Sequence, residues 1–301
     1  MALEDDLRVI MQRELAPGVD DLAHLEAMET HDLLATYANW ANRFPTPIPR
    51  QVIYSRELIR RLKRDGALRR WIRTVDHEVT NGVDLERRLS RDVDISHNSP
   101  SAPRRRRYRD LDRFLSAWGL HHLHLGPRPQ DGSRVRSSTL LFVAFVQNRA
   151  YFVGAFAHGT WDRDILLAIM ADNWPDDDHA PLIPIRGALG LERSISEEDR
   201  VVLRKGHVST FYERGNRIYA ARSGITTAGT AMDSTQWANR VMRSLDAVQN
   251  LVEHDPTELL KQFQRLGGSP TSQPTWKIVV RDKVLVVADE RSETHAPLLQ
   301  F

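Results

Sequence analysis

The chain has 301 residues, of which 41% are hydrophobic and seven are tryptophan, which is ample for a folded protein with a real core. It contains no cysteine, so disulfide bonds, thiolate zinc sites, iron–sulfur clusters and a cysteine nucleophile are excluded. The formal net charge is only +2. No leader-like segment opens the chain, and no apolar run approaches the roughly eighteen residues that span a bilayer. The sequence therefore predicts a cytoplasmic protein without a membrane partner.

The N-terminal part has the periodicity of helices. Apolar residues recur at helical spacing between residues 20 and 43, and alternate prolines then favour an extended segment over 44–50. Ser55 is placed to cap a helix that ends near Lys63. A second amphipathic helix is expected over 67–79.

The centre and the C-terminal part mix strands with helices. After a loop rich in Ser, Pro and Arg, we expect in the centre a short helix at 108–117, a strand within 118–126, a hairpin of 137–146 with 150–157, and a helix at 162–172. Further on we expect hairpins of 207–212 with 217–221 and of 276–280 with 284–288, and helices at 234–252 and 256–266.

This order of elements predicts an α+β protein with N-terminal helices, a central antiparallel sheet flanked by helices, and a C-terminal α+β region. We expect three consecutive domains. They are an N-terminal helical segment at 1–43, a central domain at 44–175 and a C-terminal domain at 176–301.

The predicted central strand carries three histidines within four positions: His121, His122 and His124. Side chains two apart on a strand share a face, so His122 and His124 should lie together while His121 points away. His158 follows the hairpin and could meet them. Imidazole can transfer protons near neutral pH and can bind metals, and it can also simply pack.

A metal site is one interpretation of His122, His124 and His158. A cupin-like site also has His-x-His on a strand, but it needs a glutamate soon afterwards, and residues 126–130 are Gly-Pro-Arg-Pro-Gln. Nearby arginines would also repel a cation. These neighbours favour proton transfer, so we expect neither a metal nor another cofactor.

Basic residues are concentrated just before the histidine strand. They are Arg104, Arg105, Arg106, Arg107 and Arg109, with Arg113 close behind them. Eight more lie on the two predicted upstream helices: Arg56, Arg60, Arg61, Lys63, Arg64, Arg69, Arg70 and Arg73. Such clusters can neutralise phosphates, although a solvated linker and salt-bridged helix faces would have the same composition. RNA or another nucleic acid is therefore the expected partner.

The central element order resembles that of the RelE/ParE-like ribonuclease toxins. Helices and a strand precede Arg134-Val135-Arg136-Ser137-Ser138-Thr139-Leu140-Leu141-Phe142-Val143, a tight turn, Tyr151-Phe152-Val153-Gly154-Ala155-Phe156 and a histidine at the strand end. The resemblance covers about residues 50–172. It implies metal-independent cleavage of RNA and an inhibitor protein as a further partner.

The implied reaction needs a base, an acid and a cation that stabilises the charge on phosphorus. On this resemblance, His124 and His158 would form the acid–base pair and His122 would support them. Arg134 and Arg136, expected to share a strand face, would clamp the phosphate.

A second candidate site is the segment 224–230, which precedes a predicted helix. Its members Thr226, Thr227, Gly229 and Thr230 could bind an anion through hydroxyls and backbone amides. The simpler alternative, which we favour, is a turn before a helix capped by Asp233.

Two classes of function remain open at this point. The first is an endoribonuclease of the toxin or phage-defence kind. The second is a non-catalytic module that binds nucleic acid or protein, in which the histidines only pack. Convergence of His124, His158 and an arginine in one open cleft would favour the enzyme.

Overall fold

The computed structural model describes residues 3–103, 108–160, 163–281, 284–292 and 295–296. The chain forms two compact units, which we call the terminal unit and the central unit. The terminal unit comprises Met1–Ala38, Ser96–Arg107 and Ser234–Phe301, and the central unit comprises Asn39–Ile95 and Tyr108–Asp233. The α+β class is confirmed.

The expected division into segments 1–43, 44–175 and 176–301 differs from these units. The N-terminal helices share a unit with the C-terminal elements: the ring centroids of Tyr37 and Trp237 lie 6.0 Å apart, and the backbone N–H of Ile278 donates to the Asp6 carboxylate at 3.1 Å. A unit assembled from distant segments leaves no boundary in local composition, so a pass along the chain could not find it.

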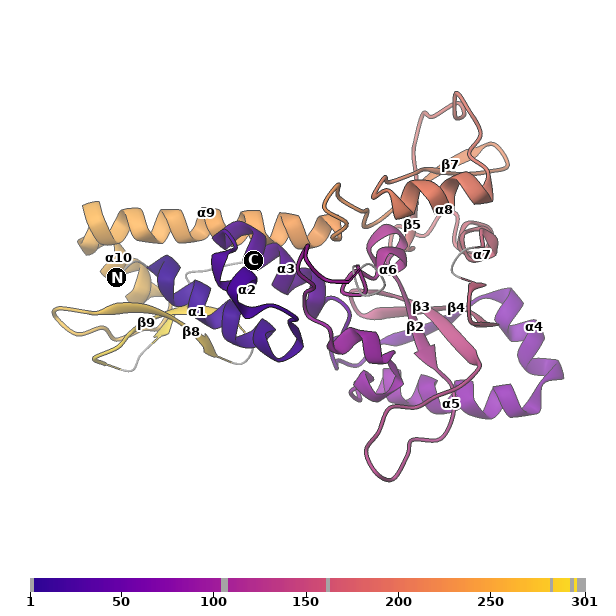
Figure 1. The fold of residues 1–301 in the computed structure, drawn as a ribbon, viewed down its shortest axis with the longest axis horizontal. Helices are drawn as coiled ribbons and strands as arrows, with labels where there is room; N and C mark the ends of the chain where they lie inside the picture. The colour runs from indigo at the N-terminus through magenta and orange to yellow at the C-terminus, as the bar shows by residue number, and fades with distance from the viewer. Residues whose placement is uncertain (1–2, 104–107, 161–162, 282–283, 293–294, 297–301) are drawn as a thin grey trace. The chain divides into compact units, whose positions relative to one another are not determined.

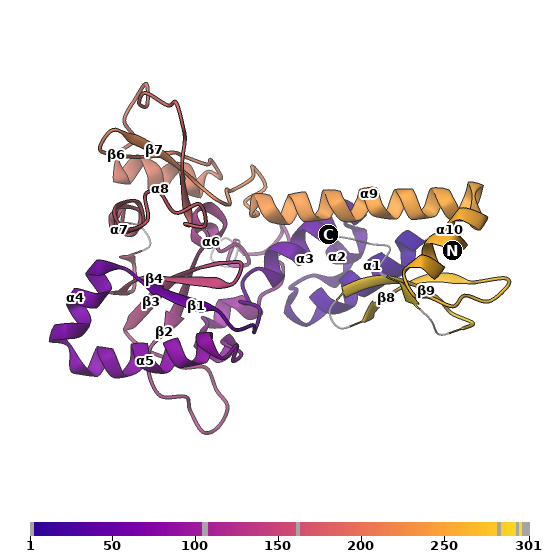
Figure 2. The ribbon, with the colours of Figure 1, turned by 180° about the vertical axis from the view of Figure 1, so that it is seen from behind.

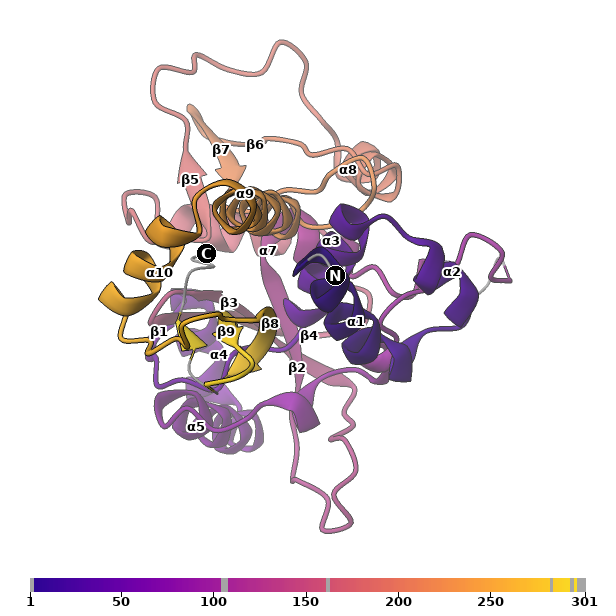
Figure 3. The same cartoon turned by 90° about the vertical axis from the view of Figure 1, so that its left-hand side faces the viewer.

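The terminal unit is helical with one small sheet. Its elements are α1 (Leu3–Leu15), η1 (Ala16–Gly18), α2 (Leu22–Ala27), α3 (Thr30–Ala41), α9 (Met232–His254), α10 (Pro256–Arg265), β8 (Trp276–Arg281), β9 (Val284–Asp289) and β10 (His295–Ala296). The sheet has the order β10-β9-β8, and α1 lies beside β8 (Figure 3). Asp255 caps α10 by accepting the N–H of Glu258, and Pro256 is its first residue, as the sequence predicts.

The central unit is built on a mixed sheet of order β1-β4-β3-β2 (Figures 1 and 2). Its strands are β1 (Gln51–Tyr54), β2 (Leu120–His124), β3 (Thr139–Val146) and β4 (Arg149–Ala157). The histidine strand and the hairpin were predicted. The short strand β1, which pairs in parallel with β4, was not, so the sheet is not purely antiparallel.

Helices cover both faces of this sheet. The helices α4 (Arg56–Arg64) and α5 (Gly66–Thr80) cover the face of Leu123, Leu141 and Phe152 (Figure 1). The helices α6 (Arg113–Trp118) and α7 (Ile165–Asn173) cover the opposite face, which carries Leu140 and Phe142. The alternation of side chains along β2 and β3 therefore places apolar residues on both faces, as a sheet between two helical layers requires.

Helix caps and one glycine determine where α4, α5 and α6 begin and end. Ser55 caps α4, as predicted, by accepting the N–H of Leu58. Asp65 caps α5, so Gly66 begins this helix instead of ending the previous one. Asp112 caps α6, and Gly119, with φ of 68°, ends it in the left-handed conformation that glycine adopts without steric cost. The chain passes directly from that glycine into β2.

A second, smaller sheet lies in the central unit. Its order is β5-β7-β6, formed by Leu182–Pro184, Arg217–Ala221 and Tyr212–Arg214. The other elements are η2 (Glu86–Arg88), η3 (Arg91–Asp94) and α8 (Glu197–Lys205). In the described part of the chain, no helix is long and apolar enough to cross a membrane.

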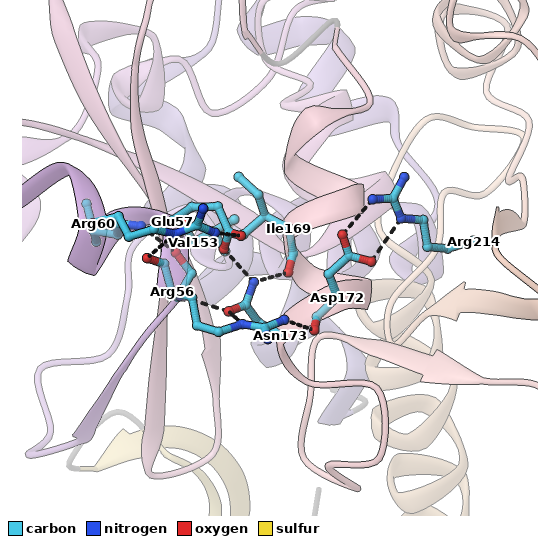
Figure 4. Close-up of polar contacts among 10 residues, drawn as sticks. Arg56, Glu57, Arg60, Val153, Ile169, Asp172, Asn173 and Arg214 are labelled. Atoms are coloured by element: carbon cyan, nitrogen blue, oxygen red, sulfur yellow. Dashed lines mark hydrogen bonds and ion pairs between the residues drawn. The ribbon is translucent and has the colours of Figure 1, made fainter.

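A polar network joins the end of α7 to α4 and β6 (Figure 4). The side-chain oxygen of Asn173 accepts the backbone N–H of Arg56 at 2.8 Å, and its amide donates to Glu57 at 2.6 Å. Asp172 accepts both Nε and Nη2 of Arg214, at 2.9 and 2.6 Å. We call this set the Asn173 network.

Candidate active site

An open pocket of about 510 Å³ lies in the central unit, on the face of the sheet that α6 covers. It contains the three histidines that the sequence predicts to meet, which are His122, His124 and His158, together with a tyrosine, several basic residues and two aspartates. We call it the histidine pocket. Its lining residues are Arg43, Ser90, Asp92, Val93, Tyr108, Arg109, Leu111, Asp112, Arg113, Phe114, His122, His124, His158, Arg204 and Lys205.

Strand pairing brings the histidines together. His122 lies opposite Phe142 and His124 opposite Leu140 in the β2–β3 ladder, so both imidazoles project from the same face. His158 follows the last residue of β4, whose pairing with Thr139 returns the chain to the start of β3. The rings of His124 and His158 are 5.5 Å apart between centroids.

The backbone of Ser137 lies between these two rings and fixes their tautomers. Its N–H donates to Nδ1 of His124 at 3.2 Å, so the neutral His124 ring carries its proton on Nε2. Its carbonyl is 3.1 Å from Nε2 of His158, and a carbonyl can only accept. The neutral His158 ring therefore has its lone pair on Nδ1.

His124 is held in its neutral form. It is 9% exposed, and burial, with the proximity of the other two titratable imidazoles, lowers its pKa to about 4. At neutral pH it can donate from Nε2 but carries no charge.

His122 is oriented by a carboxylate. Its Nδ1 lies 3.9 Å from one oxygen of Asp112, while the other oxygen of Asp112 accepts the N–H of Leu115 at 2.9 Å. The residue that caps α6 therefore also places a carboxylate beside the His122 imidazole.

A buried ion pair supports the end of β2. Arg88 is fully buried and pairs with Glu78, and its Nη1 also donates to the carbonyls of His124 and Gly126 at 3.1 and 3.3 Å. The ion pairs with Arg88 and Arg128 lower the pKa of Glu78, although burial opposes this shift. These contacts fix the backbone that carries His124.

His121 lies on the opposite face of the sheet, as strand alternation predicts. Its ring contacts Phe145 at 5.3 Å between centroids, and its Nε2 is 3.0 Å from the carbonyl of Asn42. Burial lowers its pKa to about 4. These contacts are those of a packed side chain.

The pocket has a surplus of basic side chains, with five basic and two acidic residues in its lining. Arg43 is buried and donates to the backbone carbonyls of Asp92, Asp110 and Ile95. Burial lowers the pKa of Arg113, and its guanidinium lies 4.6 Å from the ring centroid of Tyr108. The basic side chains of the pocket are thus positioned by backbone carbonyls and by contact with an aromatic ring.

Two expectations about arginines need correction. Arg134 and Arg136 do not share a strand face, because β3 begins only at Thr139. Arg134 forms ion pairs with Glu86 and Asp94, so its guanidinium already contacts two carboxylates. Arg136 is exposed, and its charge contributes to the low pKa of His124. Neither residue is among the described lining of the pocket.

Only part of the basic cluster before the histidine strand lies within the described residues. Arg109 lines the pocket and pairs with Asp92. Arg104, Arg105, Arg106 and Arg107 lie outside the described residues. The binding role expected for these five arginines stays a prediction.

The segment 224–230 forms a turn closed by its own hydrogen bonds. The N–H of Thr226 donates to the carbonyl of Thr230 at 2.9 Å, and the N–H of Gly229 donates to the carbonyl of Thr226 at 2.8 Å. The hydroxyls of Thr226 and Thr230 bond to each other at 2.8 Å, and the Thr227 carbonyl contacts His207. With these groups engaged inside the turn, the geometry favours the turn over an anion site.

The sequence did not single out several polar residues of the pocket, among them Arg43, Asp112 and Arg204. Asp112 could have been found from its position directly before the helix at 113–118, where an aspartate is typical of a helix cap. Arg204 comes from α8, whose signals were Ser196 as cap, acidic residues in its first turn and basic ones in its last.

Among the described residues, no three histidine or carboxylate side chains are grouped so that they could hold a metal ion. A scan against protein-family models, a search of curated proteins and a search of solved structures each returned no match. The interpretation of the site therefore depends on its own geometry.

Proposed function

We propose that the protein is a metal-independent endoribonuclease of the toxin or phage-defence type. The observation that carries the proposal is the meeting of His122, His124 and His158 in one open pocket whose basic side chains outnumber its acidic ones. Such a pocket offers proton transfer and binding of a phosphodiester at the same place.

The reaction is attack by an RNA 2′-hydroxyl on the adjacent phosphorus. The bond from O2′ to phosphorus forms, and the bond from phosphorus to O5′ breaks. His158 takes the proton of the 2′-hydroxyl on Nδ1, and His122 gives a proton to O5′. The products are a 2′,3′-cyclic phosphate and a free 5′-hydroxyl.

This division of roles follows from the hydrogen-bond partners. The neutral His158 ring has its lone pair on Nδ1 because its Nε2 faces the Ser137 carbonyl. His122 is assigned the role of acid because its Nδ1 lies 3.9 Å from the Asp112 carboxylate. His124, which the resemblance suggested as one of the acid–base pair, is a neutral donor from Nε2 to a phosphate oxygen, because its Nδ1 already accepts from Ser137.

The first test is cleavage of a fluorogenic RNA by the full chain in the presence of EDTA. We expect a cyclic phosphate product by mass spectrometry and no cleavage when the scissile nucleotide is 2′-deoxy. His122→Ala and His158→Ala should each lower the rate by about 10²–10⁴-fold. His254→Ala, a histidine at the end of α9, is the matched control and should leave the rate unchanged.

A second test separates the acid from the base. RNA with sulfur in place of O5′ has a leaving group that needs no protonation. It should restore cleavage by His122→Ala and leave His158→Ala inactive. Wild-type rates in His122→Ala, His124→Ala and His158→Ala would overturn the assignment of catalysis to these histidines, and absence of cleavage by the wild-type chain would instead favour a non-catalytic module.

The toxin class is tested in cells. Expression should arrest growth if the protein cleaves cytoplasmic RNA, and His124→Ala should relieve the arrest. An inhibitor protein encoded beside such a toxin should bind the wild-type chain and block cleavage in vitro.

A further inference from the structure

The exposed face of α5 carries a basic groove that lies apart from the histidine pocket. It is open, has a volume of about 700 Å³, and is lined by Gly66, Arg69, Arg70, Arg73, Thr74 and His77. Residues at these spacings share one side of a helix. Arg70, Arg73, Thr74 and His77 are exposed and Arg69 is half-buried. We call this the α5 groove.

The charge of the α5 groove is not neutralised. Its lining contains no acidic residue. In the described parts of the chain, Arg69, Arg70 and Arg73 make no ion pair. Arg69 donates from Nε to the carbonyl of Leu62 at 2.9 Å. Other arginines of the central unit, such as Arg134 and Arg214, do meet carboxylates. Unneutralised guanidinium groups in a row are typical of a surface that binds a polyanion.

The α5 groove and the histidine pocket belong to opposite sides of the central sheet. The inner side of α5 packs Leu68, Ile72 and Val75 into the core with Leu123 and Leu141. Those two strand residues alternate with His122 and His124, whose side chains leave the other face. The charge of this groove therefore does not serve the histidines directly.

We propose that the α5 groove binds the phosphate backbone of RNA. Arginines at successive turns can each contact a phosphate, and Gly66 and Thr74 are small enough to let a backbone approach the helix. A membrane surface fits less well, because an interfacial helix exposes an apolar face, whereas the apolar face of α5 is buried. The inference goes beyond the proposed cleavage, since it requires nothing of the histidines.

The test compares two charge-matched triple variants of the full chain. One is R69Q/R70Q/R73Q. The control is R186Q/R193Q/R217Q, which removes three exposed arginines elsewhere in the central unit. Binding is measured by fluorescence anisotropy with a 2′-O-methyl RNA of about 30 nucleotides, which cannot be cleaved, at salt concentrations from about 50 to 200 mM. Thermal melts establish that both variants fold.

We expect the α5 variant to lose about tenfold or more in affinity at low salt. The slope of log K against log salt should become shallower by about two, since each lost contact to a single strand contributes about 0.7. The control should keep the wild-type slope. The 2′-O-methyl RNA reports binding without cleavage, so failure of the cleavage proposal and failure of this one are distinguishable.

Equal affinities and slopes for the two triple variants would overturn the proposal. So would binding of the wild-type chain to phosphatidylglycerol vesicles without binding to the RNA. DNA of the same sequence separates backbone charge from the 2′-oxygen. Equal binding of DNA and RNA through Arg69, Arg70 and Arg73 supports recognition of backbone charge alone, whereas binding of DNA only would contradict an RNA site.

Discussion

The histidine pocket and the Asn173 network are built from the same types of residue but differ in how charge is balanced. In the network, Asp172 receives two hydrogen bonds from Arg214, and Asn173 joins Arg56 to Glu57 (Figure 4). In the pocket, five basic side chains face two acidic ones, and one of these, Asp112, is shared between a helix cap and His122.

This difference separates groups that hold the fold from groups available to a ligand. A polar network in which donors meet acceptors stabilises one conformation and offers little to a substrate. A pocket with surplus donors and cations depends for its geometry on the contacts around it, such as those of Arg88, which pairs with Glu78 and donates to the carbonyl of His124. The following substitutions test whether the distinction holds.

Asp112→Asn should have the largest effect, on rate and not on stability. Asparagine caps helices as well as aspartate, so α6 should remain folded, while the charge beside His122 is lost. We expect RNA cleavage to slow by about 10–100-fold, or about 1.4–2.7 kcal/mol of transition-state stabilisation, with a changed acid limb of the pH–rate profile. A rate equal to wild type would show that Asp112 only caps α6.

Acid should weaken β2, which carries His121 on one face and His124 on the other, before it weakens the Asn173 network. His121 and His124 have a pKa of about 4 in the folded protein against an ordinary 6.5. The unfolded chain therefore takes up protons that the folded protein refuses, and stability falls as the pH drops from 6.5 towards 4. Asp172, whose pKa the Arg214 contact lowers from 3.8, should keep its contribution down to a lower pH.

The measurement is urea unfolding over this pH range with wild type and His121→Asn. The variant lacks one of the titrating groups, so its loss of stability on acidification should be smaller by about 1–3 kcal/mol. A loss of the same size in both proteins would mean that the low pKa of His121 is not coupled to folding.

The sequence predicted the histidine strand and its faces because alternation is a local property. It also predicted the hairpin that delivers His158. It could not predict that Ser137 lies between His124 and His158, because Ser137 meets them only through its main-chain groups. Nor could spacing reveal that the partners of Arg134, at Glu86 and Asp94, lie far upstream.

Among the elements that escaped prediction, β1 and α8 did so for different physical reasons. β1 has only four residues and derives its stability from parallel pairing with β4, which local sequence does not encode. The helix α8 buries Arg200 and Arg204, whereas a search for helices follows apolar residues. Arg200 is satisfied by Asp164 at 3.0 Å and by the Phe211 carbonyl at 2.7 Å, acceptors that only the folded protein brings within reach.

Asn173→Ala should lower the stability of the protein by disrupting the Asn173 network, without changing the rate of RNA cleavage. The substitution removes the acceptor of the Arg56 N–H and the donor to Glu57, which should cost about 1–2 kcal/mol in the free energy of unfolding. The specific activity of the folded fraction should equal that of wild type. Asn148→Ala, in the turn between β3 and β4, is the matched control and should change stability less. Loss of activity without loss of stability in Asn173→Ala would place the network in the catalytic machinery.

Arg214→Gln should have the smallest effect, although its ion pair with Asp172 has good geometry. Both side chains are substantially exposed, at 47% and 38%, so water and salt screen their attraction. We expect a loss below about 1 kcal/mol, measured by urea unfolding, and a smaller one at high salt. A loss as large as that of Asn173→Ala would show that the ion pair and the amide act as one unit. If the loss is small, the half-buried amide of Asn173 carries the network, because its lost hydrogen bonds are less readily replaced by water.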